Sequence, residues 1–414
     1  MLPATATASA TTSPASAMLH RLLCGLLAVA PLAAQSPFAV GTRDVAWPNT
    51  TGSGAASLTA RVLYPATSAA TNAPLLPQAG GWPVVVFLHG FAITGTSYVP
   101  LGTQWAQQGF VVVLSNTSQF DNVGQENDGR ALFPAVVAAN AAAGGPFQAG
   151  LDTTRVVLAG HSMGGGNVAN VLRNNPGYRC GYAIAPVTPR DNNGALVTTP
   201  LGIVAGQGDT ITPPATNATP YYNGVTNFAD LKFYYLLNGD ASHTNLAGLF
   251  VTSTAGTAVQ NRVAALGLGL FRHVLGLAPN GLDDAVGPPA LADARLVSLQ
   301  QQFARAVPWT SAGLRLGTTV RVSAGMEPGF GGLAAAGAPL VAPLPTPFGD
   351  LRLDPALAIL LVTGIADANR RLDGAIAVPN TPALVGAVVA LQAFGPARNA
   401  PLLLGGAIAL AVAP

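Results

Sequence analysis

The segment that most constrains the fold of this chain is Arg155–Arg173, near the middle of its 414 residues. Arg155–Ala159 is a short apolar run that predicts a buried strand, and Gly165–Arg173 predicts a helix. Between them, Gly160–Gly164 (Gly-His-Ser-Met-Gly) has the glycines that a very tight turn requires. A strand, a glycine-flanked serine turn and a helix hold the serine hydroxyl clear of a sheet edge. The pattern therefore predicts an α/β fold with Ser162 at that edge.

Residues 37–280 support this prediction because short apolar runs alternate with helix-like stretches. Strands are expected at Leu58–Tyr64, Pro83–Leu88, Phe110–Ser115, Arg155–Ala159, Cys180–Ala185, Leu201–Ala205 and Leu231–Leu237. Helices are expected at Thr103–Gln108, Gly129–Ala143, Asn167–Asn174 and Thr257–Leu275. The alternation predicts a mainly parallel sheet flanked by helices, with site-forming loops at the carboxyl edge of the strands.

The sequence changes character towards its C-terminus. Ala290–Ala306 has helical spacing and predicts a last helix packed on the first domain. From about Ser311, short apolar runs are separated by Gly, Pro and Asn turns, which predicts a small all-β domain of the sandwich type. A disordered tail is the alternative, but the high apolar content argues against it. We therefore expect an α/β domain over residues 35–309 and an all-β domain over residues 310–414.

The first 34 residues are typical of an exported protein. After Met18, a basic start precedes the apolar run Leu22–Ala34, and polar Gln35 follows. The run is too short to span a bilayer as a helix, so it predicts a secretory signal peptide rather than an anchor. We expect a secreted protein, extracellular or periplasmic, with no stable membrane insertion after removal of the signal.

Charge and cysteine content exclude other function classes. Only 9% of the residues are charged, the net charge is +2 and no basic cluster occurs, so no nucleic-acid partner is expected. Cys24 lies in the signal and Cys180 would be alone in the mature chain, which leaves no disulfide within it. There is no CxxC or Cys/His cluster, and we expect neither a metal nor an organic cofactor.

A serine at such a turn becomes a nucleophile only beside a base, and in this fold the chain order is serine, acid, histidine. His243 lies in the loop that follows the late strand Leu231–Leu237, where the base is expected. The other histidines lie in the signal, before the serine, in the turn itself and in an apolar helix (His20, His89, His161 and His273). His243 is therefore the candidate base, with an ordinary surface histidine as the alternative.

The acid that orients this base is expected at Asp209. The aspartates between serine and histidine are Asp191, Asp209, Asp230 and Asp240. Asp209 follows the predicted strand Leu201–Ala205 after a glycine turn, where this fold carries its carboxylate. Such a carboxylate holds the imidazole tautomer and stabilises its charged form. Asp240 is the rival, but it stands so close to His243 in the chain that it would reach the ring awkwardly.

Two backbone amides are expected to bind the oxyanion. One is the N–H of Met163, at the start of the helix after Ser162. The other is the N–H of Phe91, in the loop after the strand Pro83–Leu88, where Gly90 permits close approach to a substrate carbonyl. The Phe91 ring is also expected to contact the acyl group.

These segments resemble the bacterial cutinase and polyester (PET) hydrolase family, with its dienelactone-hydrolase-like relatives, over roughly residues 55–275. The resemblance is carried by Val84–Ser97, Leu151–Gly166, Gly208–Pro213 and Ala241–His243. It implies an α/β-hydrolase that cleaves small-molecule or polymeric carboxylic esters through an acyl-enzyme. It also implies a triad and an oxyanion hole, made of Ser162, Asp209 and His243 and of Phe91 and Met163.

The chain departs from the pattern of that family near its acyl cleft. Polyester hydrolases carry a tryptophan after Leu-Thr-Pro, whereas Arg190 follows Val187–Pro189 here. Ala92 and Ile93 lengthen the oxyanion loop, and the C-terminal disulfide of the family has no counterpart. Phe91 and Arg190 are therefore the expected substrate-binding side chains, in a cleft less aromatic than that of a polyester hydrolase.

Other readings concern the tail and the type of activity. Pro379–Gly386 and Leu391–Ala393 are similar to C-terminal modules of secreted planctomycete proteins, which implies attachment or sorting. A serine peptidase or amidase on the same fold is one alternative, but no group that would bind a peptide terminus is recognisable. A non-catalytic binding protein with a degenerate hydrolase domain is the other, although all members of the expected triad are present. The oligomeric state is not indicated.

Overall fold

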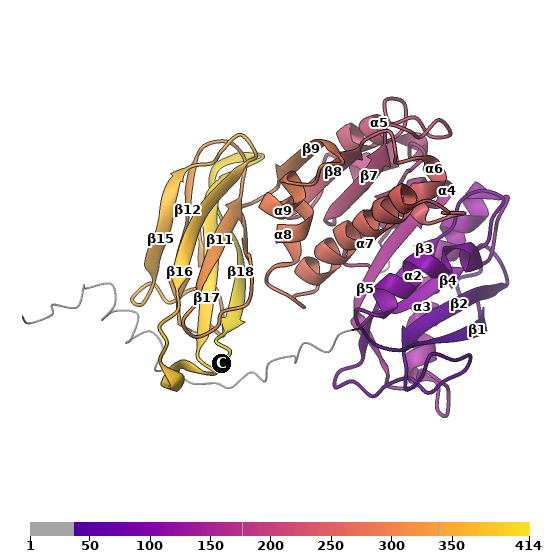
Figure 1. The fold of residues 1–414 in the computed structure, drawn as a ribbon, viewed down its shortest axis with the longest axis horizontal. Helices are drawn as coiled ribbons and strands as arrows, with labels where there is room; N and C mark the ends of the chain where they lie inside the picture. The colour runs from indigo at the N-terminus through magenta and orange to yellow at the C-terminus, as the bar shows by residue number, and fades with distance from the viewer. Residues whose placement is uncertain (1–36, 176, 338) are drawn as a thin grey trace, which may run out of the picture.

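The computed structural model describes residues 37–175, 177–337 and 339–414, so the expected signal peptide at residues 1–34 lies outside the described part. The described chain forms an α/β region followed by an all-β region (Figure 1). The predicted fold class is therefore confirmed. Within these residues, no helix combines the length and the apolar character needed to cross a membrane.

A single sheet of nine strands forms the centre of the α/β region, in the order β1-β2-β4-β3-β5-β6-β7-β8-β9. The strands are β1 (Val40–Pro48), β2 (Ser57–Pro65), β3 (Trp82–Leu88), β4 (Val111–Ser115), β5 (Leu151–His161), β6 (Gly181–Ile184), β7 (Leu201–Gly206), β8 (Leu231–Leu237) and β9 (Leu296–Phe303). From β4 to β8 all neighbours are parallel, and β1, β2 and β9 form antiparallel edges. The predicted strands are confirmed as β2 to β8, whereas β1 was not predicted.

Helices cover both faces of this sheet, which is why β3 is buried along its whole length. The helical segments are η1 (Gly95–Tyr98), α2 (Val99–Ala106), α3 (Asn122–Ala141), α4 (Met163–Leu172), η2 (Arg190–Leu196), α5 (Ala218–Gly224), α6 (His243–Ala247), α7 (Thr254–Val274), α8 (Gly281–Val286) and α9 (Pro288–Leu291). Side chains of β3 alternate between two cores, so that Val85 and Phe87 face α2 and α7 while Val84 and Val86 face α3 and α4.

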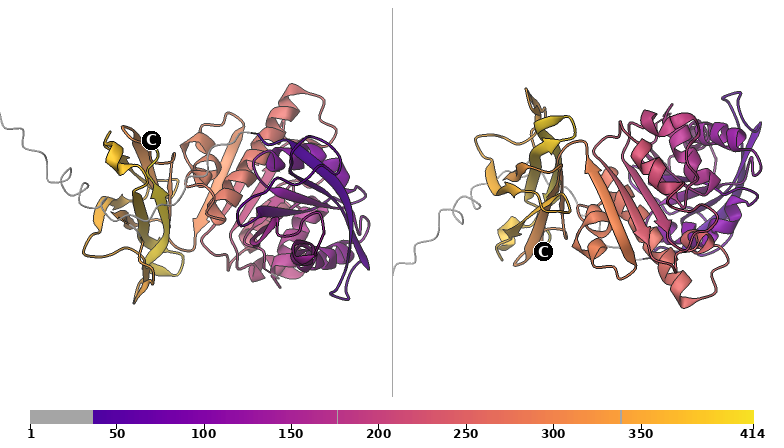
Figure 2. Two further views of the ribbon diagram at one scale, coloured as in Figure 1. Left: turned by 90° about the horizontal axis from the view of Figure 1, so that it is seen from below. Right: turned by 90° about the horizontal axis from the view of Figure 1, so that it is seen from above.

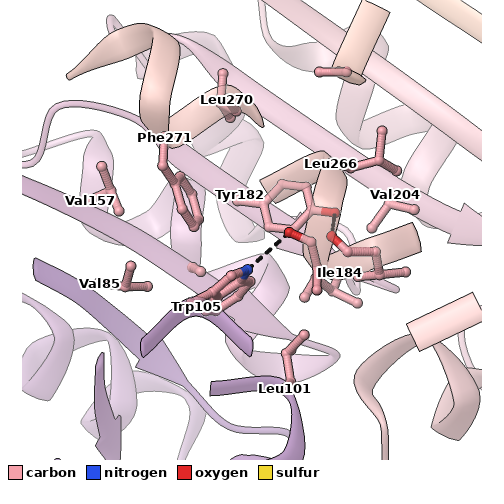
Figure 3. Close-up of a cluster of buried hydrophobic side chains, with 14 of the residues drawn as sticks. Val85, Leu101, Trp105, Val157, Tyr182, Ile184, Val204, Leu266, Leu270 and Phe271 are labelled. Carbon is pink, nitrogen blue, oxygen red and sulfur yellow. Dashed lines mark hydrogen bonds between the residues drawn. The ribbon is translucent and has the colours of Figure 1, made fainter. Parts of the chain in front are cut away.

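The core under α2 and α7 combines aliphatic side chains with the large aromatic rings of Trp105, Tyr182 and Phe271 (Figure 3). Trp105 and Phe271 pack edge to face with ring centroids 5.4 Å apart. The Trp105 indole donates a hydrogen bond of 3.0 Å to the carbonyl of Ala264, and the Tyr182 hydroxyl donates one of 2.8 Å to the carbonyl of Val263. Helix α7 is thereby joined to the sheet by polar as well as apolar contacts.

The helix predicted at Ala290–Ala306 is wrong, because only α9 at its start is helical. Leu296–Phe303 is strand β9, which pairs antiparallel with β8 and closes the sheet. Leu296 and Leu299 still pack against the core, and Phe303 is fully buried within it. The spacing of these apolar residues suits a helix, but pairing with the exposed edge of β8 satisfies a row of backbone groups at once.

The all-β region contains two packed sheets, β10-β11-β16 and β15-β12-β17-β18, and a hairpin of β13 and β14. Its strands are β10 (Val307–Thr310), β11 (Thr319–Gly325), β12 (Phe330–Ala336), β13 (Leu344–Thr346), β14 (Gly349–Leu351), β15 (Ile359–Ile365), β16 (Arg371–Ala377), β17 (Val388–Ala397) and β18 (Ala400–Ala411). A core of small aliphatic side chains lies between the sheets. The division of the chain at residues 309 and 310 into two domains stays a prediction.

The all-β region lies beyond β9, at the end of the large sheet away from β1 (Figure 2). Buried Asp283 of α8 accepts a hydrogen bond of 3.2 Å from Trp309 and forms an ion pair with Arg321 of β11. Glu327 accepts a hydrogen bond of 2.8 Å from the backbone of Phe303. We call Asp283, Trp309, Arg321, Glu327 and Phe303 the junction cluster.

Lys232, the single lysine of the sequence, lies on β8 and is only 3% exposed. Its ammonium donates hydrogen bonds of 2.7 Å to the carbonyls of Tyr222 and Val225 and lies 4.1 Å from the centroid of the Tyr222 ring. Burial lowers the pKa of Lys232 to about 8. This side chain fixes the α5 segment to the sheet.

Candidate active site

Ser162 occupies a strained turn between β5 and α4, at the carboxyl edge of the parallel strands. Its backbone has φ 58° and ψ −118°, outside the conformations that a serine ordinarily adopts. The turn is held by its neighbours, because the Ser162 amide donates to the carbonyl of Ile184 at 3.0 Å and its carbonyl accepts from Gly166 and Val187, each at 3.1 Å. Strain that is over-determined in this way is typical of a functional position.

Gly164 explains why the turn can sit against the end of β3. A Cβ at this position would lie 2.2 Å from the carbonyl oxygen of Leu88, so only glycine fits. The Gly164 amide donates to the carbonyl of His89 at 3.1 Å and ties the turn to the loop after β3. A Cβ on Gly90 would lie 3.3 Å from the Cβ of Ser162, so the serine and this loop are in contact.

Asp209 and His243 form a hydrogen-bonded pair, with 2.8 Å between Asp209 Oδ2 and His243 Nδ1. The other oxygen, Oδ1, accepts from the amides of Ile211 and Thr212 at 2.9 and 2.8 Å. Burial alone would raise the pKa of Asp209, but the hydrogen bonds from His243 and Thr212 outweigh it and hold that pKa below the ordinary value. Asp209 is therefore a buried carboxylate that orients the ring of His243.

The loops that carry these two side chains meet because glycine lets their backbones approach. A Cβ on Gly206, at the end of β7, would lie 1.9 Å from the carbonyl oxygen of Ala241. His243 is the first residue of the short helix α6 rather than part of a loop, and Ser242 caps that helix by accepting from the amide of Asn245. Asp240, the rival acid, is exposed, and its own backbone, not its carboxylate, contacts this segment.

His243 lies beside His161, the residue that precedes Ser162, with ring centroids 4.5 Å apart. Ser162 and His243 are each 8% exposed, so both reach the surface. Among the described residues, the hydroxyl of Ser162 makes no hydrogen bond. Such catalytic contacts are often long before substrate binds, so the arrangement is compatible with transfer of the serine proton to His243.

Two backbone amides next to Ser162 have no acceptor within residues 37–175, 177–337 and 339–414: those of Phe91 and Met163. Met163 begins α4, so its N–H is one of the unpaired donors of a helix start. Phe91 follows Gly90, whose close contact with Ser162 brings the loop to the nucleophile. Both amides are available to an oxyanion.

The Arg190 side chain has its observed partner on helix α3. At the start of η2, its guanidinium forms an ion pair with Glu126 of α3, a carboxylate only 1% exposed. Arg130 and Arg173 pair with the same carboxylate, so Glu126 is surrounded by three arginines. The expected role of Arg190 in the acyl cleft stays a prediction, and its observed partner is structural.

Three side chains near the site were not singled out from the sequence. The Thr212 hydroxyl lies 2.8 Å from Asp209 Oδ2 and 3.1 Å from His243 Nδ1. The Tyr98 hydroxyl lies 2.9 Å from Nδ1 of His161. Gln125 donates to the carbonyl of His89 at 2.9 Å. Thr212 could have been noticed because it follows Asp209 so closely, but Tyr98 and Gln125 are brought in by folding alone.

The remaining histidines of the α/β region are packed by their surroundings. His89 places its ring nitrogens 2.8 Å from the carbonyls of Gly90 and Thr117, which joins the loops after β3 and β4. Burial lowers the pKa of His89, brings that of His273 to about 4 and that of His161 to about 3. These rings are neutral near pH 7. Among the histidines that the structure describes, His243 is the one whose ring is hydrogen-bonded to a carboxylate, and it packs against His161, the residue before Ser162.

The sheet order, the serine turn after β5 and the acid and histidine after β7 and β8 define the class of α/β-hydrolases. Comparison with known families gives the particular group. Residues 28–261 match the family described as PET hydrolase-like, and the chain belongs to that family. The recognition made from the sequence is confirmed for this part, while the likeness of the C-terminal module is not.

Relatives with assigned names are similar to part of the chain. A bis(hydroxyethyl) terephthalate hydrolase of Streptomyces coelicolor is 30% identical over 181 residues, which cover 42% of this chain and 56% of that protein. Cutinase 1 of Thermobifida cellulosilytica is 33% identical over 164 residues, 38% of this chain and 59% of the relative. A cutinase of Thermobifida fusca is 33% identical over 38% of this chain and 52% of the relative. The chain thus spans about half the length of the curated relatives it matches.

Proposed function

We propose that this protein is a secreted serine hydrolase that cleaves carboxylic esters. His243 takes the proton of Ser162 as the serine oxygen attacks the ester carbonyl, and the amides of Phe91 and Met163 bind the oxyanion. His243 then protonates the leaving alcohol, and water repeats the cycle on the acyl-enzyme. Asp209 keeps Nδ1 of His243 protonated, so that Nε2 is free to act as the base.

The observation that carries the proposal is the 2.8 Å bond between Asp209 and His243, next to the strained turn at Ser162. A buried carboxylate on a histidine is not rare by itself. Its combination with a serine of φ 58° and two amides without acceptors is what acyl transfer requires. Membership of the PET hydrolase-like family supports the same reaction class.

An apolar rim supports an apolar ester as the substrate. Four large apolar side chains are exposed on loops that follow the parallel strands or lie close in sequence to Asp209 and His243. They are Phe91 (59% exposed), Phe120 (70%), Ile211 (66%) and Phe250 (81%). The Phe91 and Phe120 rings meet edge to face at 5.6 Å. The named relatives are a terephthalate-ester hydrolase and cutinases, and we extend that substrate type, small or polymeric, to this chain.

Export and the two-domain division belong to the same proposal. The residues expected to form the signal lie before the described part, and the family match ends at residue 261, before the all-β region begins. We propose that residues 35–309 carry the catalysis and that residues 310–414 form a separate all-β domain. Expression with the native N-terminus, followed by recovery from the medium or periplasm and N-terminal sequencing, tests the export.

An ester panel run beside Ser162→Ala tests the activity. Short and long acyl p-nitrophenyl esters, bis(hydroxyethyl) terephthalate, a triglyceride and a polyester film are the substrates. Ser162→Ala should lower kcat by roughly 10⁴-fold or more, as loss of a catalytic serine does elsewhere, whereas Ser68→Ala on an exposed loop should leave it unchanged. Retention of the wild-type rate by Ser162→Ala would refute the assignment.

The alternatives give different results in the same set of assays. A peptidase or amidase would cleave peptide or anilide substrates at rates comparable to its ester rates. A non-catalytic binding protein would fail to react with a fluorophosphonate probe at Ser162 although it is folded. Labelling of the wild-type protein, without labelling of Ser162→Ala and without peptide cleavage, is the result expected for an esterase.

A further inference from the structure

A continuous chain of hydrogen bonds runs beneath the candidate site and consists of Gly90, Tyr98, His161 and His243. The Gly90 amide donates to the Tyr98 hydroxyl at 2.8 Å. That hydroxyl lies 2.9 Å from Nδ1 of His161, and Nε2 of His161 lies 3.0 Å from the backbone carbonyl oxygen of His243. Tyr98 is fully buried and His161 is 1% exposed, so water does not compete with these bonds.

The direction of every bond follows from the groups at its ends. A carbonyl can only accept, so Nε2 of His161 carries the proton. The ring is neutral because burial lowers the pKa of His161 to about 3, and Nδ1 is therefore an acceptor. Tyr98 must then donate to Nδ1, and burial keeps its hydroxyl protonated by raising its pKa. The Tyr98 hydroxyl thus accepts from the Gly90 amide and donates to His161, and each ring nitrogen of His161 has a single role.

The chain of bonds joins two loops that must keep a fixed separation during the proposed reaction. Gly90 precedes Phe91, the expected oxyanion donor on the loop after β3. His243 is the expected base on the segment after β8. His161 stands next to Ser162 in the sequence and holds the backbone, not the ring, of His243. The Asp209 bond orients that ring, so orientation of the ring and position of its backbone are controlled by different residues.

We propose that Tyr98 and His161 are positioning residues that set the oxyanion loop and the base relative to Ser162. This inference rests on the proposed function, because the separation matters only if both groups act on one substrate carbonyl. The two residues touch neither substrate nor the reacting atoms. Their effect is on kcat, since a displacement of the base or of an oxyanion donor weakens the transition state more than the bound ester.

Tyr98→Phe is the first test, because it removes one hydroxyl and leaves the ring. It should lower kcat for a p-nitrophenyl ester by about tenfold to a hundredfold with KM changed less than about twofold. Tyr178→Phe is the matched control, since Tyr178 is equally buried and its hydroxyl donates to the carbonyl of Gly129 in α3, away from the site. The control should keep the kcat of the wild-type protein.

Substitutions of His161 separate positioning from packing. His161→Gln can place an amide N–H where Nε2 stands and should retain most of the rate. His161→Leu fills similar space without a donor and should lose at least as much kcat as Tyr98→Phe. Equal rates for the Gln and Leu variants would show that only the volume of the side chain matters, and would overturn the proposal.

A spectroscopic measurement tests the geometry without any substrate. In ¹⁵N-histidine-labelled protein, His161 should keep a protonated Nε2 and an unprotonated Nδ1 from pH 8 to pH 5, and Tyr98→Phe should perturb the Nδ1 signal. Titration of His161 with an ordinary pKa overturns the proposal even if the protein is an esterase. If the wild-type protein neither cleaves esters nor reacts with the fluorophosphonate, the proposed function itself is refuted. If the wild-type protein is active and Tyr98→Phe has the same kcat, only the positioning role of Tyr98 and His161 is refuted.

Discussion

The α/β region and the all-β region differ in what they bury. Helices on both faces of the large sheet bury aromatic side chains such as Trp105 and Tyr182 together with ionisable groups such as Asp209. The described core between the sheets of the all-β region consists of Ala, Val, Leu, Ile and Met side chains, and the buried polar side chains on its described strands, Thr310, Ser323 and Gln392, are uncharged. In this molecule, the buried, hydrogen-bonded carboxylates lie in the region where helices cover both faces of the sheet, which supplies the partners that a buried charge needs.

The two regions also differ in where their exposed apolar side chains lie. In the α/β region, Phe91, Phe120, Ile211 and Phe250 are exposed apolar side chains on loops. In the all-β region, exposed Phe330 and Ile365 instead pair across strands β12 and β15. The junction cluster supplies polar contacts between the regions. We therefore expect substitutions in the α/β region to alter catalysis and substitutions at the junction to alter stability.

The largest effect is expected from Asp209→Asn. The amide cannot hold Nδ1 of His243 protonated, so kcat should fall by about 10⁴-fold with little loss of stability. Asp240→Asn is the control, because that side chain is exposed, and its kcat should stay within about twofold of wild type. The rates of ester hydrolysis of both variants decide which aspartate is the acid. If Asp240→Asn caused the larger loss, the acid would have been assigned to the wrong aspartate.

Acid should destabilise the α/β region before the all-β region. His161 and His273 have folded pKa values of about 3 and about 4, and that of His89 is also lowered. Below about pH 6.5 the unfolded chain binds protons at these histidines that the folded chain does not bind. Their contribution to stability is therefore constant above that pH and falls below it. Each such histidine contributes up to about 1.4 kcal/mol per pH unit.

Hydrogen exchange, corrected for intrinsic rates, measures this at pH 7 and pH 5. Protection should fall in α4 and α7, whereas the sequence after residue 310 contains no histidine and its sheets should be affected only through the junction. His161→Gln should reduce the pH dependence by up to one proton. Equal losses of protection in both regions would mean that they open as one cooperative unit.

The next largest effect is a loss of stability on substitution in the junction cluster. Arg321→Gln leaves buried Asp283 with Trp309 as its remaining partner, which should destabilise the protein by about 2–3 kcal/mol. Ester hydrolysis at 25 °C should be unchanged. Arg352→Gln, which breaks an exposed pair with Asp350, should cost less than about 1 kcal/mol. Urea denaturation checks both values, and a loss of kcat in Arg321→Gln would contradict the separation of the two regions.

The smallest effect is expected from Arg190→Gln. Arg130 and Arg173 still neutralise Glu126 in that variant, so the loss of stability should be about 1 kcal/mol. KM for esters of any chain length should not change if Glu126 is the only partner of Arg190. A rise in KM for long acyl chains would instead support the role in the acyl cleft that the sequence suggested.

Much of the candidate site could be anticipated because its signals are local. The turn at Ser162 needs glycine for steric reasons that act over a few residues, and Gly164 meets them against Leu88. Asp209 and His243 follow strands whose apolar runs are easy to recognise. The parallel sheet then brings the ends of those strands together, which is a property of the topology rather than of any single residue.

The rest depends on partners that are distant in the chain. Strand β9 has helix-like spacing and becomes a strand only because β8 offers it an edge. Arg190 stands where the family resemblance suggested a cleft, yet a carboxylate on α3 takes its guanidinium. Tyr98 carries no motif at all, and its role is visible only once Gly90 and His161 lie on either side of its hydroxyl.

The buried position of Lys232 has a practical consequence for handling the protein. Amine-directed reagents attach to exposed lysines, and this chain contains one lysine, whose ammonium is engaged by two carbonyls. Reaction at that side chain requires local opening of the segment around α5. Coupling to a solid support through amines would therefore proceed almost entirely at the chain terminus, and would present the protein in a single orientation.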